Sequence, residues 1–393
     1  MTKTTKTISF TQEELQRYSR HFAVEKIGLT GQEKIKSTAV LLIGAGGIGS
    51  PAALYLNAAG IGTLGILDDD TVDLSNLQRQ IIYTTADLGF LKAETAAVHL
   101  NHQNPHVQVI PHPIRLTESN AHAIFKNYDL VIDGSDNYPT RYLTNDVCAE
   151  LKIPLISASI FQFSGQIGVF NFNPNTQSTP CYRCLYPSPP PPELIPNCAM
   201  AGVLGVVPGI LATMAVGEAL KIILELNKFQ SQLILYDTLG PKLDTYPILS
   251  NPHCEICGQH KKFAELSRFN LNNQKQNSCQ LNNSIKNPTE IQGIKQLSVQ
   301  ELLDWNKAKK SFHLLDVREN WERLINQINP SIHIPLGSLN PKNSLLDLDK
   351  TQPLIIYCKS GGRSQQAALY LSDLGFTEIY NLSGGITAWE KLI

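Results

Sequence analysis

Charge is scarce in this sequence. Charged residues make up 17% of the chain, below the roughly 25% typical of soluble domains. Lysine and arginine number 33 against 34 aspartates and glutamates, so the net charge is -1. Without an excess of either sign, no global field attracts nucleic acid or an anionic membrane surface. We therefore expect neither nucleic acid nor a membrane as a partner.

The sequence also has no apolar leader. Residues 1–15 are polar and rich in threonine, so we expect no signal peptide and a cytoplasmic location. The stretch 194–217 carries no charge and has enough residues to cross a bilayer, but prolines and glycines interrupt it. We interpret it as a buried loop that leads into an apolar helix over 210–226, a core or dimer-interface element.

The rest of the composition is that of a folded chain, with 42% hydrophobic residues among 393. At roughly 100 to 200 residues per domain, this length indicates two or three domains. Between residues 38 and 237, short apolar runs alternate with helical patterns, which predicts a doubly wound, mostly parallel α/β sheet with helices on both faces. Asn and Gln dominate residues 265–294, which we interpret as a flexible linker. The folded domains are then expected at 1–264 and 295–393, the second a small α/β domain.

A glycine-rich loop follows the first expected strand. Gly44, Gly46, Gly47 and Gly49 separate that strand from a helical pattern, and Asp68 ends the next strand. Backbone N–H groups at a helix N-terminus bind phosphate, and a carboxylate after the second strand can bind a ribose. This predicts a Rossmann-like nucleotide site. A nicotinamide dehydrogenase fits these residues equally well, and a glycine turn that only allows close packing is the non-functional alternative.

Two cations and a further carboxylate favour ATP. Arg79 and Lys92 follow the ribose carboxylate, and two cations suit a triphosphate better than a pyrophosphate already held by a helix dipole. Asp136 follows another expected strand at the carboxyl edge of the sheet, where doubly wound folds bind ligands. Its carboxylate could hold Mg²⁺.

Several sequence stretches together resemble one enzyme family. GAGGIGS at 44–50, LDDDTVDLSNLQRQ at 67–80 and DGSDNYPTRYLTND at 133–146 occur in the order typical of the MoeB/ThiF family, and the resemblance spans residues 15–258. These ubiquitin-activating-enzyme-like adenylyltransferases act on sulfur-carrier proteins. The resemblance implies that Asp68 holds the ribose and that Asp136 binds Mg²⁺. The nucleotide-binding set that it implies is Gly44, Gly46, Gly47, Gly49, Asp68, Ser75, Asn76, Arg79, Lys92, Asp136 and Asn137.

An arginine near the start of the chain carries a prediction about assembly. Arg20 matches the arginine that members of this family insert into the site of a partner subunit, so the resemblance implies a homodimer. Taken alone, Arg20 is a solvated charge on a helix. The implied reaction is attack by the C-terminal glycine carboxylate of a ubiquitin-like carrier on the α-phosphorus of ATP. Positioning and charge neutralisation suffice for such a transfer.

Two C-x-x-C pairs predict a zinc site. Each spacing lets two thiolates converge on one ion, and two such pairs give a closed tetrahedral site. Redox use of one pair is the alternative, but neither pair precedes a thioredoxin-like helical pattern, and the family has zinc at the matching positions. The four expected ligands are Cys181, Cys184, Cys254 and Cys257.

Cys198 lies in the segment that the family lays over its active site. Its surroundings carry no charge, so the residue itself reads as a small buried apolar group. The match to the family motif NC-x-x-[AG]-G implies an acyl or persulfide acceptor instead. Both interpretations remain open.

Cys358 follows an apolar run and precedes a helical pattern. The N–H groups of such a loop, together with Lys359 and Arg363, stabilise a thiolate and cradle an anion. The spacing C-x4-R is one residue shorter than that of phosphatases and resembles the rhodanese family, as do DVRE at 316–319 and LSGGITAW at 382–389. Cys358 and Arg363 are therefore expected in catalysis. One departure is that residues 327–335 lack the usual Gly-His before Ile-Pro.

Together these resemblances imply adenylation of a sulfur carrier followed by transfer of persulfide sulfur from Cys358, which gives a thiocarboxylate for molybdopterin, thiamine or tRNA thiolation. The sulfur donor is expected to be thiosulfate or a cysteine-desulfurase-type protein. A nicotinamide oxidoreductase with an accessory sulfur domain competes, but it leaves Arg79, Lys92 and Asp136 without a use. A non-catalytic interaction protein is the third class, and the intact phosphate and thiol loops argue against it.

Overall fold

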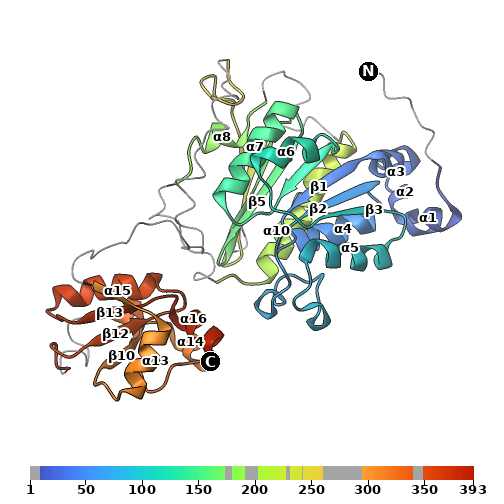
Figure 1. The fold of residues 1–393 in the computed structure, drawn as a ribbon. Coiled ribbons are helices and arrows are strands. Elements are labelled where there is room, and N and C mark those ends of the chain that lie inside the picture. The colour runs from blue at the N-terminus through green and yellow to red at the C-terminus, as the bar shows by residue number, and fades with distance from the viewer. Residues whose placement is uncertain are drawn as a thin grey trace. The chain divides into compact units, whose positions relative to one another are not determined.

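The chain divides into two compact units, Met1–Leu281 and Asn282–Ile393. The computed structural model describes residues 9–172, 179–190, 202–226, 231–240, 242–259, 294–339 and 348–393. Figure 1 traces both units in chain order. The linker expected at 265–294 lies outside the described residues except for its last position.

The first unit is built on one eight-stranded sheet with the order β3-β2-β1-β4-β5-β6-β7-β8. The five neighbouring strands β3, β2, β1, β4 and β5 pair in parallel. From β5 on, the strands β6, β7 and β8 are added antiparallel. The parallel half matches the expected doubly wound sheet. The bounds are β1 Ala39–Ile43, β2 Thr63–Leu67, β3 Gln108–His112, β4 Leu130–Asp133, β5 Leu155–Phe161, β6 Ser164–Phe170, β7 Gln232–Asp237 and β8 Lys242–Pro247.

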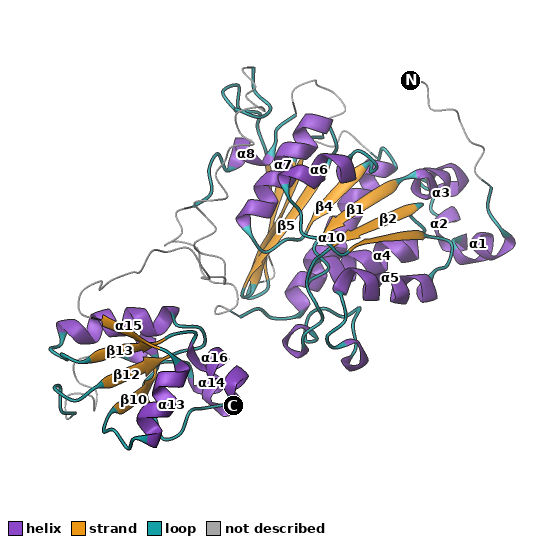
Figure 2. Ribbon diagram, viewed as in Figure 1, coloured by secondary structure: helices purple, strands orange, loops and turns teal. Residues whose placement is uncertain are grey.

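Helices cover both faces of this sheet, as the sequence predicts (Figure 2). Successive strand residues point to opposite faces, so Leu42 packs in the core beneath α4, α5 and α10, while Leu41 packs in the core beneath α6 and α7. The bounds are α1 Gln12–Arg17, α2 Ser19–Phe22, α3 Gly28–Ser37, α4 Gly49–Ala59, η1 Leu74–Asn76, η2 Thr85–Asp87, α5 Lys92–Gln103, α6 Glu118–Phe125, α7 Tyr138–Leu151, α8 Tyr182–Leu185 and α10 Val206–Ile223.

The apolar helix α10 is a core element. Among the described helices, it alone has the length and hydropathy that a membrane span requires, and half of that stretch is buried inside the protein. Val207, Leu211 and Ala215 are fully buried against β5, β6 and α4. The expectation of a core helix here is therefore confirmed.

The second unit has a smaller, fully parallel sheet with the order β11-β10-β12-β13-β9. One buried cluster lies between the sheet and α15, and another lies between the sheet, α13 and α16. The bounds are β9 Ile294–Leu297, α13 Val299–Lys307, β10 His313–Asp316, α14 Asn320–Ile325, β11 Ile332–His333, η4 Leu336–Ser338, β12 Leu354–Tyr357, α15 Gly362–Asp373, β13 Ile379–Leu382 and α16 Gly385–Leu392.

Two helices of the second unit begin in the same way. At α13, the Ser298 side chain accepts from the backbone N–H of Glu301, whose carboxylate accepts from the backbone N–H of Ser298. Glu319 and Glu322 form the equivalent reciprocal cap at α14. Both caps satisfy N–H groups that the first turn of a helix leaves free.

Candidate functional sites

The glycine loop turns sharply between β1 and α4. Gly44 has a φ of +87°, and a Cβ on Gly49 would lie 1.8 Å from the Gly44 carbonyl oxygen. Only glycine fits where the chain approaches itself so closely. The backbone N–H groups at the start of α4 are thereby brought to the carboxyl edge of the sheet, where an anion can bind.

Asp68 closes over this loop from the end of β2. Its Oδ2 accepts a hydrogen bond from the Ala45 N–H at 2.7 Å, and its Oδ1 accepts one from the Asp70 N–H at 2.9 Å. Burial raises the pKa of Asp68. The carboxylate is thus fixed beside the glycine loop, with lone pairs left for a further donor such as a sugar hydroxyl.

The two expected phosphate ligands approach the loop from different sides. The Arg79 Cδ lies 3.4 Å from the position of a Cβ on Gly47, and Arg79 Nη1 donates to the Ser75 carbonyl at 3.0 Å. Lys92 is buried at the start of α5, and its Nζ pairs with an Asp70 carboxylate oxygen at 3.0 Å. That carboxylate is exposed, so an anionic ligand can compete with it for Lys92.

A buried tyrosine connects the glycine loop to Lys92. The Tyr83 hydroxyl lies 3.1 Å from the Ala45 carbonyl oxygen and 3.1 Å from the Lys92 carbonyl oxygen. Its one proton can serve either acceptor. Sequence analysis did not select Tyr83, because a tyrosine in an apolar stretch carries no motif.

Three of the expected nucleotide ligands also cap helices. Ser75 donates its backbone N–H and hydroxyl to Asp73, and Asn76 accepts from the Asp73 N–H, which together form the cap of η1. Asn137 caps α7 by accepting from the Thr140 N–H at 2.9 Å. To bind a nucleotide directly, these side chains would have to give up or share the hydrogen bonds of the helix caps.

Asp136 is exposed at the end of the β4 loop. This loop rests on a buried pair that sequence analysis also missed: Arg141 Nε lies 3.8 Å from an oxygen of Asp133, and Arg141 Nη2 donates to the Ser135 carbonyl at 2.6 Å. Burial raises the pKa of Asp133. The pair holds the backbone next to Asp136 while leaving its carboxylate open to solvent.

Two further residues were predicted for this site, Arg20 and Cys198. Arg20 is exposed on α2. Cys198 lies outside the described residues.

The four expected metal ligands converge in space. Their sulfur atoms all lie within 4.8 Å of one another: Cys181 and Cys254 are 3.6 Å apart, and Cys184 and Cys257 are 3.2 Å apart. Both distances are far longer than the ~2.05 Å of a disulfide. Hydrogen bonding to Cys184 raises the pKa of Cys181, whereas hydrogen bonding to Cys181 lowers that of Cys254. The cluster fits a zinc ion, whose charge lets all four sulfurs be thiolates.

The first pair lies on a single turn of helix. Cys181 is the N-cap of α8, which contains Cys184 and ends at Leu185, so no long helix follows the pair here. The α8 turn is anchored by Arg183, which donates to both carboxylate oxygens of Asp146 at 2.8 and 2.7 Å. Because the second pair of thiols lies against the first, the cluster favours a metal over a redox dithiol.

Cys358 sits at the base of the second loop, 1% exposed, between β12 and α15. Its Sγ accepts from the Gly361 N–H at 3.1 Å and lies 3.4 Å from the Ser364 hydroxyl. The Ser364 hydroxyl also lies 2.6 Å from the Asn381 side-chain oxygen, and its one proton can serve either acceptor. The thiol is thus placed where N–H and hydroxyl groups can stabilise a sulfur anion.

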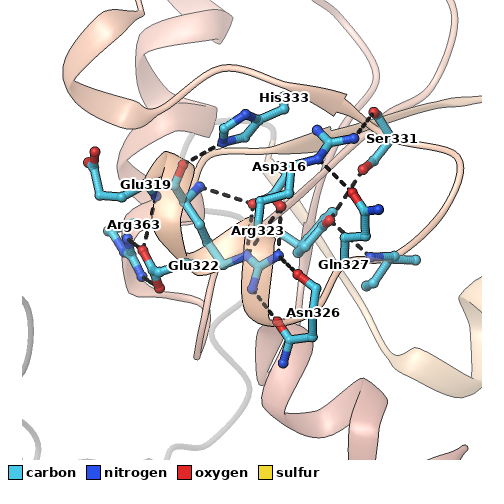
Figure 3. A network of polar contacts seen from close by, with 12 residues as sticks. Asp316, Glu319, Glu322, Arg323, Asn326, Gln327, Ser331, His333 and Arg363 are labelled. Carbon is cyan, nitrogen blue, oxygen red and sulfur yellow. Dashed lines mark hydrogen bonds and ion pairs between the residues drawn. The ribbon is translucent and has the colours of Figure 1, made fainter.

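The DVRE motif forms a buried polar network beside this loop (Figure 3). Arg318 donates from Nε and Nη2 to the two oxygens of Asp316, at 2.9 and 2.8 Å. Its Nη1 donates to the Asn326 side-chain oxygen at 2.7 Å, and Nη2 also donates to the Asn326 carbonyl at 2.9 Å. Burial opposes ionisation of Asp316, but the bonds from Arg318 outweigh it and lower its pKa. His333 Nε2 lies 2.8 Å from the Arg318 carbonyl oxygen. His333 stands directly before Ile334-Pro335, so only the glycine of the expected Gly-His is missing, with Ile332 in its place. Asn326 and His333 thus hold this motif.

Arg363 is paired rather than free. Its guanidinium donates to both carboxylate oxygens of Glu322 at 2.5 and 2.8 Å, and both side chains are almost fully buried. Figure 3 shows the two groups facing each other. The sequence pattern selected Arg363 but gave no indication of this partner, which lies on α14.

Comparison with known proteins identifies both units. The ThiF family matches residues 18–258, and the rhodanese-like domain family matches residues 298–392. The chain belongs to the ThiF family. It is 37% identical over 386 residues to the probable adenylyltransferase/sulfurtransferase MoeZ of Mycobacterium tuberculosis, with 98% of this chain and 94% of the relative covered. It is 36% identical to the adenylyltransferase and sulfurtransferase uba4 of Ogataea parapolymorpha, with 98% of each covered.

A third relative matches only the first unit. The sulfur carrier protein adenylyltransferase of Thermus thermophilus is 45% identical over 259 residues, which covers 65% of this chain and 96% of the relative. The crystal structure of MccB from Escherichia coli has a TM-score of 0.54 at 20% identity and covers 65% of this chain and 75% of that one, which supports the fold. This ThiF-family chain is therefore an enzyme with an adenylyltransferase part, which uses ATP, and a rhodanese-type sulfurtransferase part.

Proposed function

We propose that this ThiF-family enzyme adenylates the C-terminal glycine of a ubiquitin-like sulfur-carrier protein and then converts that glycine to a thiocarboxylate with sulfur from Cys358. The observation that supports this most strongly is the presence in one chain of a glycine loop closed by Asp68 and of a buried thiol in an N–H-rich loop. The first suits a nucleotide, and the second suits a sulfur anion. Linking them raises the effective concentration of donor sulfur to the order of millimolar.

Adenylation needs the triphosphate to be positioned more than it needs a base. The carrier carboxylate attacks the α-phosphorus, the bond to the β-phosphate oxygen breaks, and pyrophosphate leaves. Asp68 orients the ribose, Arg79 and Lys92 neutralise the phosphates, and the exposed Asp136 holds Mg²⁺. Lys92 exchanges its Asp70 partner for a phosphate oxygen, which is a charge-assisted contact of equal kind. Ser75, Asn76 and Asn137 shape the backbone around this site.

Sulfur transfer starts from a persulfide on Cys358. Its terminal sulfur attacks the acyl carbon of the adenylate, and AMP leaves. A second thiol then attacks the Cys358 sulfur of the resulting acyl disulfide, so that the thiocarboxylate leaves and a disulfide with Cys358 remains for a cellular thiol to reduce. Cys198, from the segment 191–201 outside the described residues, is the candidate for this second thiol.

The remaining parts of the proposal concern assembly and location. The enzyme works as a homodimer in which Arg20 reaches the site of the other subunit, and it acts in the cytoplasm. Its sulfur comes from thiosulfate or from a cysteine-desulfurase-type protein. The thiocarboxylate serves molybdopterin, thiamine or tRNA thiolation. The exposure of Arg20 on α2 supports the first statement, because an arginine that enters a partner site must be accessible in one subunit.

A zinc ion held by the four-cysteine cluster fixes α8 to the segment after β8. Purified enzyme should carry about one zinc per chain, because two C-x-x-C pairs converge within ligand distance. Cys254→Ser should lose the metal and lower the unfolding temperature, while Cys148→Ala, at a buried cysteine outside the cluster, should retain it. Elemental analysis that finds no zinc in the wild type would remove this part of the proposal.

The central test of adenylation is exchange of labelled pyrophosphate into ATP in the presence of a ubiquitin-like carrier that ends in glycine. Asp136→Ala should lower the exchange rate at least about 100-fold, as loss of a metal clamp on the phosphates does. Asp244→Ala removes a partly exposed carboxylate that pairs with Lys242 and should change the rate less than about twofold. Full exchange by the Asp136 variant would contradict the metal role of this residue.

A further inference from the structure

The pair between Arg363 and Glu322 alters the charge that the thiol loop presents. Arg363 lies in the first turn of α15, five positions after Cys358, and is one of the two cations of the loop, with Lys359. Its two terminal nitrogens are both engaged by Glu322, with side chains only 9% and 8% exposed. A buried bidentate pair of this kind neutralises the guanidinium and fixes its orientation.

The other charges around the loop do not restore a positive field. Glu319 and the Cys358 sulfur also act electrostatically on Arg363. Arg318 is occupied by Asp316. In the described part of this unit, the remaining cation of the loop is Lys359, whose side chain is exposed to solvent. In side-chain charges alone, the loop is therefore close to neutral before the thiol ionises and negative afterwards, and its N–H groups remain the anion-stabilising part.

Two classes of sulfur donor respond differently to such a loop. With a persulfide R–S–SH, the Cys358 thiolate attacks the outer sulfur and a new S–S bond forms. The S–S bond of the donor breaks, and the thiolate R–S⁻ leaves with the bonding pair. With thiosulfate, the same attack breaks its S–S bond and releases sulfite with the pair. Neither step needs an oxidant or a reductant. Thiosulfate, however, brings two negative charges to the thiolate, whereas the persulfide brings one or none.

We propose that Glu322 is a specificity-determining residue: by neutralising Arg363 it makes the loop of Cys358 select alkyl persulfide donors over dianionic thiosulfate. This rests on the proposed function, in which Cys358 is loaded with sulfur, and it names the class of donor. Glu322 acts through Arg363 and so is a positioning residue. The persulfide can be carried by a protein or by a small thiol, because the recognised chemistry is the same.

Glu322→Gln is a clean substitution for this test. Glutamine keeps the size of the side chain and can still accept from the Glu319 N–H, so the helix cap at α14 is preserved. Glu301→Gln is the matched control, because Glu301 holds the same capping position at α13 and is paired with Ser298. Both changes remove one negative charge from the same unit, but only the first releases Arg363.

The measurement is the rate of sulfur loading onto full-length enzyme, with thiosulfate and with cysteine persulfide as donors, at low ionic strength. Glu322→Gln should raise kcat/KM for thiosulfate about tenfold, mainly through KM, as one uncompensated charge near an anion does. It should change kcat/KM for cysteine persulfide less than about twofold, and salt should remove the gain. Glu301→Gln should change neither. A cysteine desulfurase charged with persulfide, run in parallel, tells a protein source from a small thiol.

Equal effects of Glu322→Gln on both donors, or none on either, would overturn the inference and leave Glu322 a structural residue. If the variant does not fold, the wild type decides: its kcat/KM for thiosulfate should fall less than about twofold between 0.05 and 0.5 M salt, and a tenfold fall would reveal an uncompensated cation. Failure of the wild type to load from any donor would instead reject the proposed role of Cys358.

Discussion

Two loops in this molecule, residues 44–50 and residues 358–364, each join a buried parallel strand to the first turn of a helix. They differ in the residue at the turn. Gly44 brings no side chain to its loop, and a carboxylate at the end of the next strand, Asp68, accepts from the Ala45 N–H. Cys358 instead brings its own sulfur, which takes the Gly361 N–H. The same arrangement of strand, loop and helix thus suits a dissociable ligand in the first unit and the side chain of a nucleophilic cysteine in the second.

Of the substitutions that distinguish the two loops, removal of the thiol should have the largest effect on activity. Cys358→Ala should abolish sulfur loading, because no other atom of the loop can form the persulfide. Pyrophosphate exchange should stay within about twofold of the wild type, since the glycine loop keeps all its contacts. The check is mass spectrometry for the added sulfur, together with the exchange assay. Cys148→Ala, a buried cysteine in the first unit, should leave both measurements unchanged.

Adding a side-chain carbon at the close approach within the glycine loop should have the next largest effect. A Cβ on Gly49 would lie 1.8 Å from the Gly44 carbonyl oxygen, so Gly49→Ala must displace the backbone. A shift of about 1 Å in such a site reduces rates about 100-fold, and we expect that loss in pyrophosphate exchange with sulfur loading retained. Gly209→Ala in α10 is the control, because nothing lies within 4 Å of its Cβ position. Normal exchange by the Gly49 variant would mean that the loop is not the phosphate site.

The smallest effect should come from a side chain that supports the glycine loop from behind. Tyr83→Phe removes a hydroxyl that reaches the Ala45 and Lys92 carbonyl oxygens, at a cost of about 1 kcal/mol. We expect KM for ATP to rise about fivefold with kcat nearly unchanged. Tyr128→Phe removes a comparable buried hydroxyl bonded to His112, and it should leave KM for ATP unaltered. Equal KM values for ATP in the two variants would show that Tyr83 does not support the nucleotide site.

Several parallel strands of both sheets were predictable from sequence because they are continuous apolar runs. The runs at 39–43 and 63–67 became β1 and β2 without a change of bounds, since a strand buried on both faces has no polar positions to obscure it. The antiparallel extension was not predicted. Its last strand, β8, is mostly exposed and polar at Lys242–Pro247, so its pairing with β7 leaves little trace in local hydrophobicity.

At the sites, the residues inside motifs were predictable and their partners were not. The spacing of Gly44, Asp68 and Cys358 is local to a strand and its following turn, and such spacing can be read from sequence. The contact of Glu322 with Arg363 spans 41 positions and depends on how α14 packs against the loop. The cap roles of Ser75 and Asn137 were likewise hidden, because the same polar residues suit a cap and a ligand site.

The four-cysteine cluster has a topological consequence. Cys181 and Cys254 are 73 positions apart, and so are Cys184 and Cys257, with α10, β7 and β8 between them. An ion bound to all four sulfurs would close this segment into a ring even when the rest of the unit is unfolded. By polymer statistics, one such closure removes chain entropy worth about 4 kcal/mol from the unfolded state. The sheet half that local sequence encodes most weakly would then fold as a tethered loop rather than as a free chain end.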